Sequence, residues 1–207
     1  MNRPVPGKIV CVGRNYAGHA RELGNELPAQ PMLFFKPSTA LIGPDEAIVL
    51  PAASANVHYE AEIALVVGRR ARRVAARDAI DILAGVACAN DVSARDLQKL
   101  DGQWGRAKGF DTFLPLGPTI TEGIDWDRLE IVGRLNGEVR QHGQVGDMVF
   151  PIPVLIEFIT GVMTLEPGDV ILTGTPDGVG PLAEGDVYEV EIPGLSSISN
   201  PVRSETA

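Results

Sequence analysis

Glycine and proline interrupt this chain so often that its apolar segments stay short. The 207 residues include 23 glycines and 16 prolines, which are scattered between apolar runs. Because both residues favour turns and weaken regular elements, the pattern predicts short strands joined by tight turns. We therefore expect one β-rich α+β domain over residues 1–207, with a few short helices.

The clearest strand is expected at residues 58–67, where apolar and other residues alternate. An Asn136-Gly137 pair predicts a hairpin turn, and Ser93 with Asp96 resembles a capping box. Asn15 can cap a short helix that Gly24 ends. Other helices are expected at 78–83 and 154–160, and further strands at 8–12, 32–36, 47–50, 85–89, 130–135, 170–173 and 187–192.

Charge and cysteine content narrow the class of protein. The net charge is −9, so a phosphate-backbone partner is not expected. Cys11 and Cys88 each lie in an apolar segment and form no CxxC motif, which favours a reducing cytoplasm. No apolar run approaches the roughly 18 residues of a membrane span, and the N-terminal residues lack a hydrophobic signal core.

Glu60 and Glu62 are the first candidate site residues. In a strand, side chains two apart share a face, so these carboxylates would lie about 7 Å apart. Taken alone, the pair fits an exposed polar face of an edge strand better than a site. Asp91 changes this balance, because it directly follows an apolar run with the character of a buried strand. A structural role for Asp91, capping the next turn, stays open.

If the three carboxylates converge, they make an all-oxygen site with a formal charge of −3. Such a set suits Mg²⁺, Mn²⁺ or Ca²⁺ better than Zn²⁺, which prefers nitrogen and sulfur. Three protein ligands would leave positions open for water or a chelating substrate. We therefore expect a metal site of the catalytic kind at Glu60, Glu62 and Asp91, with Mg²⁺ the favoured ion.

Six segments, in this order, resemble the fumarylacetoacetate hydrolase family, and in particular its short acylpyruvase and oxaloacetate decarboxylase members. They cover nearly the whole chain: VGRNYAGHARELG (12–24), FFKPSTALIG (34–43), HYEAEIALVVG (58–68), NDVSARDLQ (90–98), RAKGFDTFLPLGP (106–118) and LTGTPDGVG (172–180). The resemblance implies a fold of mixed β-sheets (a β-roll). It also implies that Glu60, Glu62 and Asp91 bind Mg²⁺ or Mn²⁺.

His19 and Glu22 lie three residues apart and would share a helix face. A carboxylate beside an imidazole fixes its tautomer and raises its basicity, although a surface pair on a helix fits the same spacing. The resemblance implies that the two form the dyad that activates water. Residues 25–31 are polar and bounded by proline, so residues 14–31 are expected to form a mobile lid. The dyad would reach the metal when residues 18–31 close over substrate.

The resemblance assigns further residues to the substrate. Arg95 and Gln98 share a helical face after Asp91 and would contact the substrate or its oxyanion. Lys108, the third catalytic candidate, would adjoin the metal and could stabilise the oxyanion, although a solvent-exposed loop position also fits it. Remaining candidates are two cations that could neutralise a substrate carboxylate and one threonine that would hydrogen-bond substrate: Arg14, Lys36 and Thr175.

These residues lead to one expected chemistry, in which hydrolysis of acylpyruvates such as fumarylpyruvate is the favoured reaction. A divalent ion would hold an α-keto acid and stabilise its enolate, while His19 activates water for carbon–carbon cleavage of an acylpyruvate. The same site could decarboxylate oxaloacetate, or act as a tautomerase or isomerase of keto acids. A non-catalytic protein that binds metal and dicarboxylate is the alternative from another class. A homodimer is expected because family members commonly form one.

Overall fold

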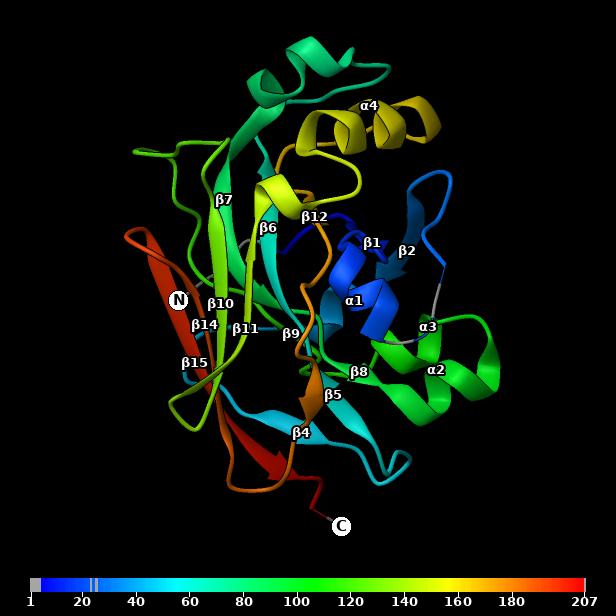
Figure 1. Cartoon of the computed structure of the whole chain (residues 1–207), viewed down its shortest axis with the longest axis vertical. Helices are drawn as coiled ribbons and strands as arrows, with labels where there is room; N and C mark the ends of the chain where they lie inside the picture. Colours follow the sequence, from blue (N-terminus) through cyan, green and yellow to red (C-terminus); the bar gives the residue numbers. More distant parts are fainter. Residues whose placement is uncertain (1–4, 23, 25, 207) are drawn as a thin grey trace.

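The structure is a computed structural model that describes residues 5–22, 24 and 26–206. Its first sheet has the strand order β2-β1-β12-β6-β7, and only the β1–β12 pair is parallel (Figure 1). β6 lies in the interior of this sheet, with β12 on one side and β7 on the other. The strands are β1 (Ile9–Gly13), β2 (Met32–Lys36), β6 (Ala61–Val67), β7 (Leu83–Asn90) and β12 (Val170–Leu172).

The second sheet has the order β11-β10-β14-β15-β4, and only β15 and β4 are parallel. Asn136 and Gly137 have φ angles of 54° and 80°, which fit the expected hairpin turn between β10 and β11. The strands are β4 (Ile48–Leu50), β10 (Glu130–Leu135), β11 (Glu138–Gln144), β14 (Val187–Ile192) and β15 (Ser196–Ser204).

Two small sheets and short helices complete the fold. The small sheets are β13-β5-β8 and β3-β9; their strands are β3 (Leu41–Ile42), β5 (Val57–Tyr59), β8 (Ser93–Ala94), β9 (Leu114–Pro115) and β13 (Gly180–Pro181). The α-helices are α1 (Ala17–Glu22), α2 (Arg95–Asp101), α3 (Gly105–Lys108) and α4 (Ile152–Val162). Four 3₁₀ turns are Ser38–Ala40, Ala76–Asp78, Ile80–Ile82 and Val145–Asp147.

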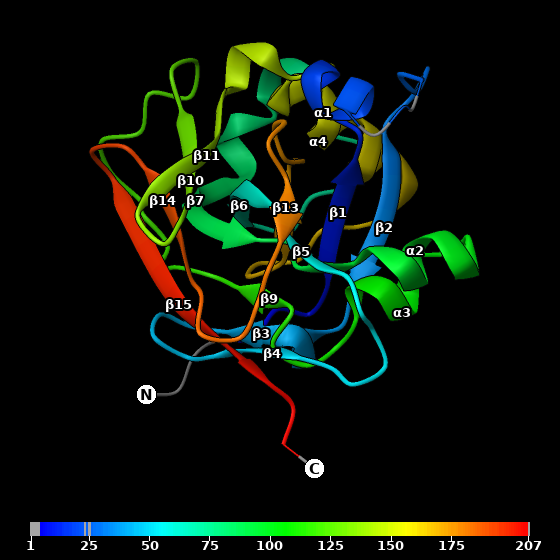
Figure 2. The ribbon, with the colours of Figure 1, turned by 60° about the horizontal axis from the view of Figure 1, so that its bottom comes forward.

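The two large sheets pack face to face and bury the core between them. β14 and β15 contact β7, and β10 and β14 contact β6 (Figure 2). Tyr59 on β5, a strand of a smaller sheet, stacks on Tyr188 of β14, with ring centroids 4.3 Å apart. Because β6 is covered on both faces, nearly all its residues are buried. The expected β-rich architecture is confirmed. Among the described residues, no helix is long and apolar enough to cross a membrane.

The expected single strand at 58–67 is wrong in one important respect. It is divided at Glu60 into β5 and β6, which belong to different sheets. At the break, the backbone N–H of Glu60 donates to the side-chain oxygen of Asn90, and the N–H of Asp91 donates to the Glu60 carbonyl. Both carboxylate-bearing segments therefore leave their sheet at the same place.

Two local predictions also fail, and one strand was not expected. Residues 78–82 lie in two successive 3₁₀ turns, and Leu83 already begins β7. α2 has Ala94 as its N-cap and no capping box, since the Ser93 hydroxyl donates to the Asp91 carbonyl and Asp96 bonds Ser54. β15 was not expected, because its sequence is polar and contains Pro201.

Candidate active site

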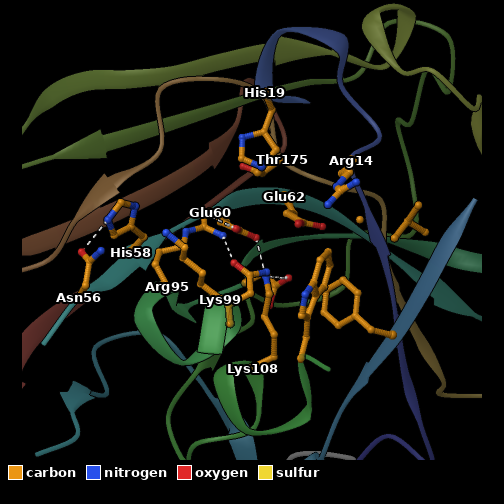
Figure 3. Close-up of a pocket in the computed structure, with 16 residues that line it drawn as sticks. Arg14, His19, Asn56, His58, Glu60, Glu62, Arg95, Lys99, Lys108 and Thr175 are labelled. Carbon is orange, nitrogen blue, oxygen red and sulfur yellow. Dashed lines mark hydrogen bonds and ion pairs between the residues drawn. The ribbon is translucent and has the colours of Figure 1, made fainter. Parts of the chain in front are cut away.

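The three acidic residues meet at the end of the β6–β7 pair. In this antiparallel pair Ala61 faces Asn90 and Glu62 faces Ala89, so Glu60 and Asp91 emerge side by side. One carboxylate oxygen from each of Glu60, Glu62 and Asp91 lies within 4.8 Å of the others, and all three residues are buried (Figure 3). An exposed edge strand, which the Glu pair alone favoured, is therefore wrong.

Buried cations hold two of these carboxylates. Arg95 Nη2 lies 2.5 Å from Glu60 Oε1, and Lys108 Nζ lies 2.8 Å from Glu60 Oε2 and 2.6 Å from Asp91 Oδ2. Although burial alone raises the pKa of Glu60, the charges of Arg95 and Lys108 hold it well below its ordinary value. Lys108 lies at the end of α3 and is 2% exposed, so the solvent-exposed loop position considered for it is wrong.

Lys36 has a different place from the one expected. Its Nζ lies 2.7 Å from Asp91 Oδ1 and 3.1 Å from the Val92 carbonyl, on the buried side of the carboxylate cluster. Burial lowers the pKa of Lys36, and Asp91 opposes that effect. Lys36 does not line the cavity, so it supports Asp91 rather than neutralising a substrate carboxylate.

Glu62 is the carboxylate of the cluster with the least compensation. It accepts a 2.7 Å hydrogen bond from the Gly174 backbone, and no residue in 5–22, 24 or 26–206 forms an ion pair with it. Burial, Asp91 and Glu60 together raise the pKa of Glu62 well above its ordinary value. Desolvated carboxylates that crowd in this way fit a hard divalent cation, which would supply the missing positive charge.

Gln141 was not predicted from the sequence, yet it holds the backbone between the two glutamates. Its side-chain oxygen accepts hydrogen bonds from the Ala61 N–H (2.9 Å) and the Tyr188 hydroxyl (2.8 Å). Its NH₂ group donates to Thr175 Oγ1 and to the Pro176 carbonyl, each at 2.8 Å. All four bonding positions of this buried amide are filled. No local sequence signal distinguishes Gln141 on the exposed strand β11.

Thr175 lines the cavity, but its hydroxyl has protein partners. Oγ1 donates to the Ala61 carbonyl at 2.9 Å and accepts from Gln141. Both polar groups of the Ala61 peptide unit are therefore tied to Gln141 or Thr175. The structure gives this hydroxyl a supporting role behind the Glu pair, in addition to the substrate contact expected for Thr175.

His19 and Glu22 come together on α1, beside the carboxylate cluster. His19 Nδ1 lies 3.6 Å from Glu22 Oε2, which is ion-pair range but longer than a hydrogen bond. His19 is 6% exposed and lines the cavity, and burial lowers the pKa of its imidazole. A neutral imidazole with Nδ1 toward Glu22 leaves Nε2 as its free basic atom.

Helix α1, which lies within the expected lid, packs against the segment after β12. Glu22 accepts hydrogen bonds of 3.2 Å from the Gly178 backbone, and Gly18 packs so closely on Asp177 that a Cβ there would lie 2.4 Å from its carboxylate. The dyad therefore faces the carboxylates without a further movement of α1. Leu23 and Asn25, which belong to the expected lid, lie outside the described residues.

The cavity that joins these groups has a volume of about 600 Å³. Figure 3 shows His19 above the carboxylates, Lys108 below them, and Arg14 and Arg95 on opposite sides. Arg95 also donates to Gln98 at 3.0 Å, and both residues line the cavity. Other lining residues are an aromatic pair and a polar pair: Phe34 with Trp104, and Asn56 with His58.

Known proteins with similar sequences and structures were compared with this chain. The family described as fumarylacetoacetate (FAA) hydrolase C-terminal matches residues 8–203. The protein named oxaloacetate tautomerase FAHD1, mitochondrial, of Arabidopsis thaliana is 46% identical over 92% of this chain and 89% of its own. The oxaloacetate decarboxylase, mitochondrial, of Dictyostelium discoideum is 40% identical over 92% and 90%.

Solved structures of enzymes are also similar to this chain. The crystal structure of 5-carboxymethyl-2-hydroxymuconate delta-isomerase from Mycobacterium smegmatis superposes with a TM-score of 0.91 at 46% sequence identity. The match covers 98% of this chain and 81% of that chain. These similarities, in sequence and in fold, agree with the family resemblance that the six sequence segments carry.

Proposed function

The chain belongs to the fumarylacetoacetate hydrolase family, and on this premise we propose that it tautomerises small 2-keto acids by proton transfer beside a bound divalent cation. The observation that carries the proposal is the position of His19, a neutral imidazole backed by Glu22 and directed at a buried carboxylate cluster. Relatives named as an oxaloacetate tautomerase and as an isomerase support this reaction class.

Glu60, Glu62 and Asp91 are the residues that would hold the ion, which we propose to be Mg²⁺ or Mn²⁺. A bound ion of this kind supplies Lewis-acid stabilisation of negative charge on a chelated keto acid. Arg95 and Lys108 lie against the same carboxylates and would keep them ionised and correctly oriented. These side chains would therefore bind the ion and keep its ligands in place, whereas a different side chain would transfer the proton.

His19 Nε2 would move that proton. It takes a proton from the carbon next to the keto group, and the electron pair of the broken C–H bond shifts into the keto group. The proton is then delivered to the keto oxygen, which gives the enol. Glu22 keeps the opposite nitrogen oriented and favours the imidazolium that forms between the two transfers. The keto acid and its enol have the same atoms and charge, so the reaction needs no second substrate.

Acylpyruvate hydrolysis is a second candidate, and the size of the cavity favours it. About 600 Å³ leaves room beside a pyruvate unit for an acyl group and a water molecule. His19 would then take a proton from water, and the hydroxide would add to the distal carbonyl carbon. Cleavage of the carbon–carbon bond leaves the acid and the enol form of pyruvate. Decarboxylation of oxaloacetate, the activity in the Dictyostelium relative's name, is a third possible outcome.

One set of assays tests these reactions together. We would supply oxaloacetate, acetylpyruvate and fumarylpyruvate with Mg²⁺, and follow enol absorbance, pyruvate and CO₂ against controls with Mg²⁺ alone. Faster interconversion of keto and enol oxaloacetate, without loss of total oxaloacetate, is the result expected of a tautomerase. Pyruvate released from the two acylpyruvates would identify a hydrolase. If none of the three compounds reacts while metal is bound, the proposed function is wrong.

A further inference from the structure

The polar pair on the cavity wall, Asn56 and His58, has no part in the proposed function. His58 Nε2 lies 2.9 Å from Asn56 Oδ1, and both residues line the cavity. Because an amide oxygen can only accept a hydrogen bond, Nε2 carries the ring proton and the other ring nitrogen, Nδ1, is an acceptor. Asn56 therefore fixes the tautomer of His58 and determines which of its nitrogens can receive a donor.

The acceptor Nδ1 of His58 is buried, and among the described residues it has no hydrogen-bond partner. It has almost no surface accessible to solvent, so it faces the protein rather than the open cavity. A desolvated acceptor that stays unpaired costs free energy, and such atoms are uncommon in folded proteins. A donor on the same buried side of the ring would remove this cost.

Arg95 carries a donor of this kind. Its Nη1 donates to Gln98 and its Nη2 is paired with Glu60. Its third nitrogen, Nε, is buried and has no hydrogen-bond partner in the part of the chain that the structure describes. The wall of the cavity thus contains one buried acceptor and one buried donor that both lack a partner.

His58 and Arg95 are neighbours in the fold. The backbone N–H of Arg95 donates to the Asn56 carbonyl at 2.8 Å, and His58 faces Ser93 in the β5–β8 pair. Figure 3 shows the two side chains next to each other on one side of the carboxylates. Burial and the positive charge of Arg95 lower the pKa of His58 to about 4. The ring beside the guanidinium is therefore neutral.

We propose that His58 is a positioning residue for Arg95, because its Nδ1 accepts a hydrogen bond from Arg95 Nε–H and fixes the plane of the guanidinium. The planar group is then held at all three nitrogens, by Gln98, Glu60 and His58. A neutral imidazole does this without adding a negative charge beside Glu60. The consequence for turnover rests on the proposed function, in which Arg95 keeps Glu60 ionised and oriented.

Two amide substitutions distinguish the two ring nitrogens of His58. The amide oxygen of asparagine is as many bonds from Cβ as Nδ1 is, and the NH₂ group of glutamine is as many bonds from Cβ as Nε2 is. His58→Asn therefore keeps an acceptor for Arg95, whereas His58→Gln keeps only a donor for Asn56. We expect His58→Gln to lower kcat/KM by about tenfold to a hundredfold, because a hydrogen bond to a charged group is lost. His58→Asn should recover most of this loss.

A double-mutant cycle tests whether His58 acts through Arg95. Arg95→Lys keeps the positive charge and removes Nε. In the Arg95→Lys background, His58→Gln should cause no further loss of kcat/KM, because the bond is already absent. Losses that multiply would overturn the proposal, since His58 would then act independently of Arg95.

Nitrogen NMR of the labelled, metal-free protein gives a readout that needs no turnover. The Arg95 Nε–H signal is identified by its absence from Arg95→Lys. A coupling between Arg95 Nε and His58 Nδ1 is transmitted only through a shared hydrogen bond, and we expect it in the wild type. The Arg95 Nε–H proton should exchange with solvent faster in His58→Gln than in the wild type or in His58→Asn.

The outcomes separate this inference from the proposed function. If no keto acid reacts, the proposed function fails, and the nitrogen coupling still decides whether His58 and Arg95 are bonded. If the wild type reacts but the coupling is absent, or if His58→Gln and His58→Asn have equal kcat/KM, the positioning role is wrong and the proposed function stands. Equal falls in the melting temperature of the two variants, without a kinetic difference, would show that His58 serves folding alone.

Discussion

At the scale of single residues, two glutamates two positions apart have opposite acid–base behaviour. Glu60 contacts Arg95 and Lys108, which hold its pKa low against the effect of burial. Burial raises the pKa of Glu62, which has only a backbone partner beside two other carboxylates. Both are almost inaccessible to water, so contact with a cation, rather than exposure, decides the difference.

Replacing Glu62 by glutamine should separate metal binding from folding. Folding raises the pKa of Glu62 above its ordinary value of about 4.5. Above that pH the ionised side chain therefore destabilises the metal-free folded state. Glu62→Gln removes this destabilising charge. The metal-free variant should therefore unfold at a higher temperature at pH 7 than the metal-free wild type. Its affinity for Mg²⁺, measured by calorimetry, should fall. Unchanged Mg²⁺ affinity would contradict the assignment of Glu62 as a ligand.

Replacing His19 should lower the rate of turnover without weakening the binding of Mg²⁺. We expect His19→Ala to lower kcat by about a hundredfold to ten thousandfold, the range of general acid–base catalysis. Mg²⁺ affinity should stay near that of the wild type, because no carboxylate is removed. His142→Ala is the matched control, since His142 is exposed and pairs with Glu130. Full turnover by His19→Ala would exclude the proposed base.

The pH dependence follows from the lowered pKa of His19. Burial disfavours the charged imidazole, so the base stays neutral below the ordinary pKa of 6.5. kcat/KM should therefore hold its value at pH 6.5 and fall only at lower pH, as the imidazole gains a proton. The stability contributed by neutral His19 has the same sign: it is full above pH 6.5 and is lost as pH falls through the lowered pKa. An acid limb centred above pH 6.5 would refute this description.

At the scale of elements, the site depends on strands that are distant in sequence. β11 and the segment after β12 clamp the Ala61 peptide unit through Gln141 and Thr175. α1 docks on the same segment through Glu22 and Gly178. The loop after β12 therefore contacts both the proposed metal ligands and the proposed base, which explains how one rigid frame can hold the two.

Replacing Gln141 tests whether its hydrogen bonds to the Ala61 segment support the metal site. Gln141→Leu leaves the Ala61 N–H and the Tyr188 hydroxyl without their buried acceptor, which should cost about 1–3 kcal/mol of unfolding free energy for each group. Mg²⁺ affinity should also fall, because the backbone between the two glutamates loses its support. Glu138→Gln, a change on the same strand at an exposed residue whose side chain pairs only with exposed Arg140, should affect neither quantity strongly. A loss of stability with unchanged metal affinity would show that the clamp serves folding alone.

At the scale of the whole molecule, folding buries the carboxylate cluster and thereby links metal binding to folding. An ion that binds the folded chain alone stabilises it by about 2.7 kcal/mol at a hundred times its dissociation constant. Mg²⁺ should therefore raise the melting temperature of the wild type, and a chelator should reverse the rise. Ca²⁺, which accepts the same oxygen ligands at longer distances, serves as a comparison ion. No shift at saturating Mg²⁺ or Mn²⁺ would count against a metal site.

The sequence by itself determined the fold class, most strand positions and the family. Short apolar runs, the Asn136-Gly137 turn and six ordered motifs are local patterns, and each depends on residues close together in the chain. The acidic and basic residues of the site were also named from these motifs. Lys36 was the residue whose expected role changed most, because its pairing with Asp91 joins strands far apart in sequence.

Only the tertiary structure decided how these residues interact. The break at Glu60, the burial of Lys108 and the bonds of Gln141 all arise from contacts between segments tens of residues apart. Local propensity carries no information about such contacts, since the same polar residue is exposed or buried according to what packs against it. Arg14 is a further case: its residue type suggested a substrate contact, and its left-handed backbone was visible only in the fold.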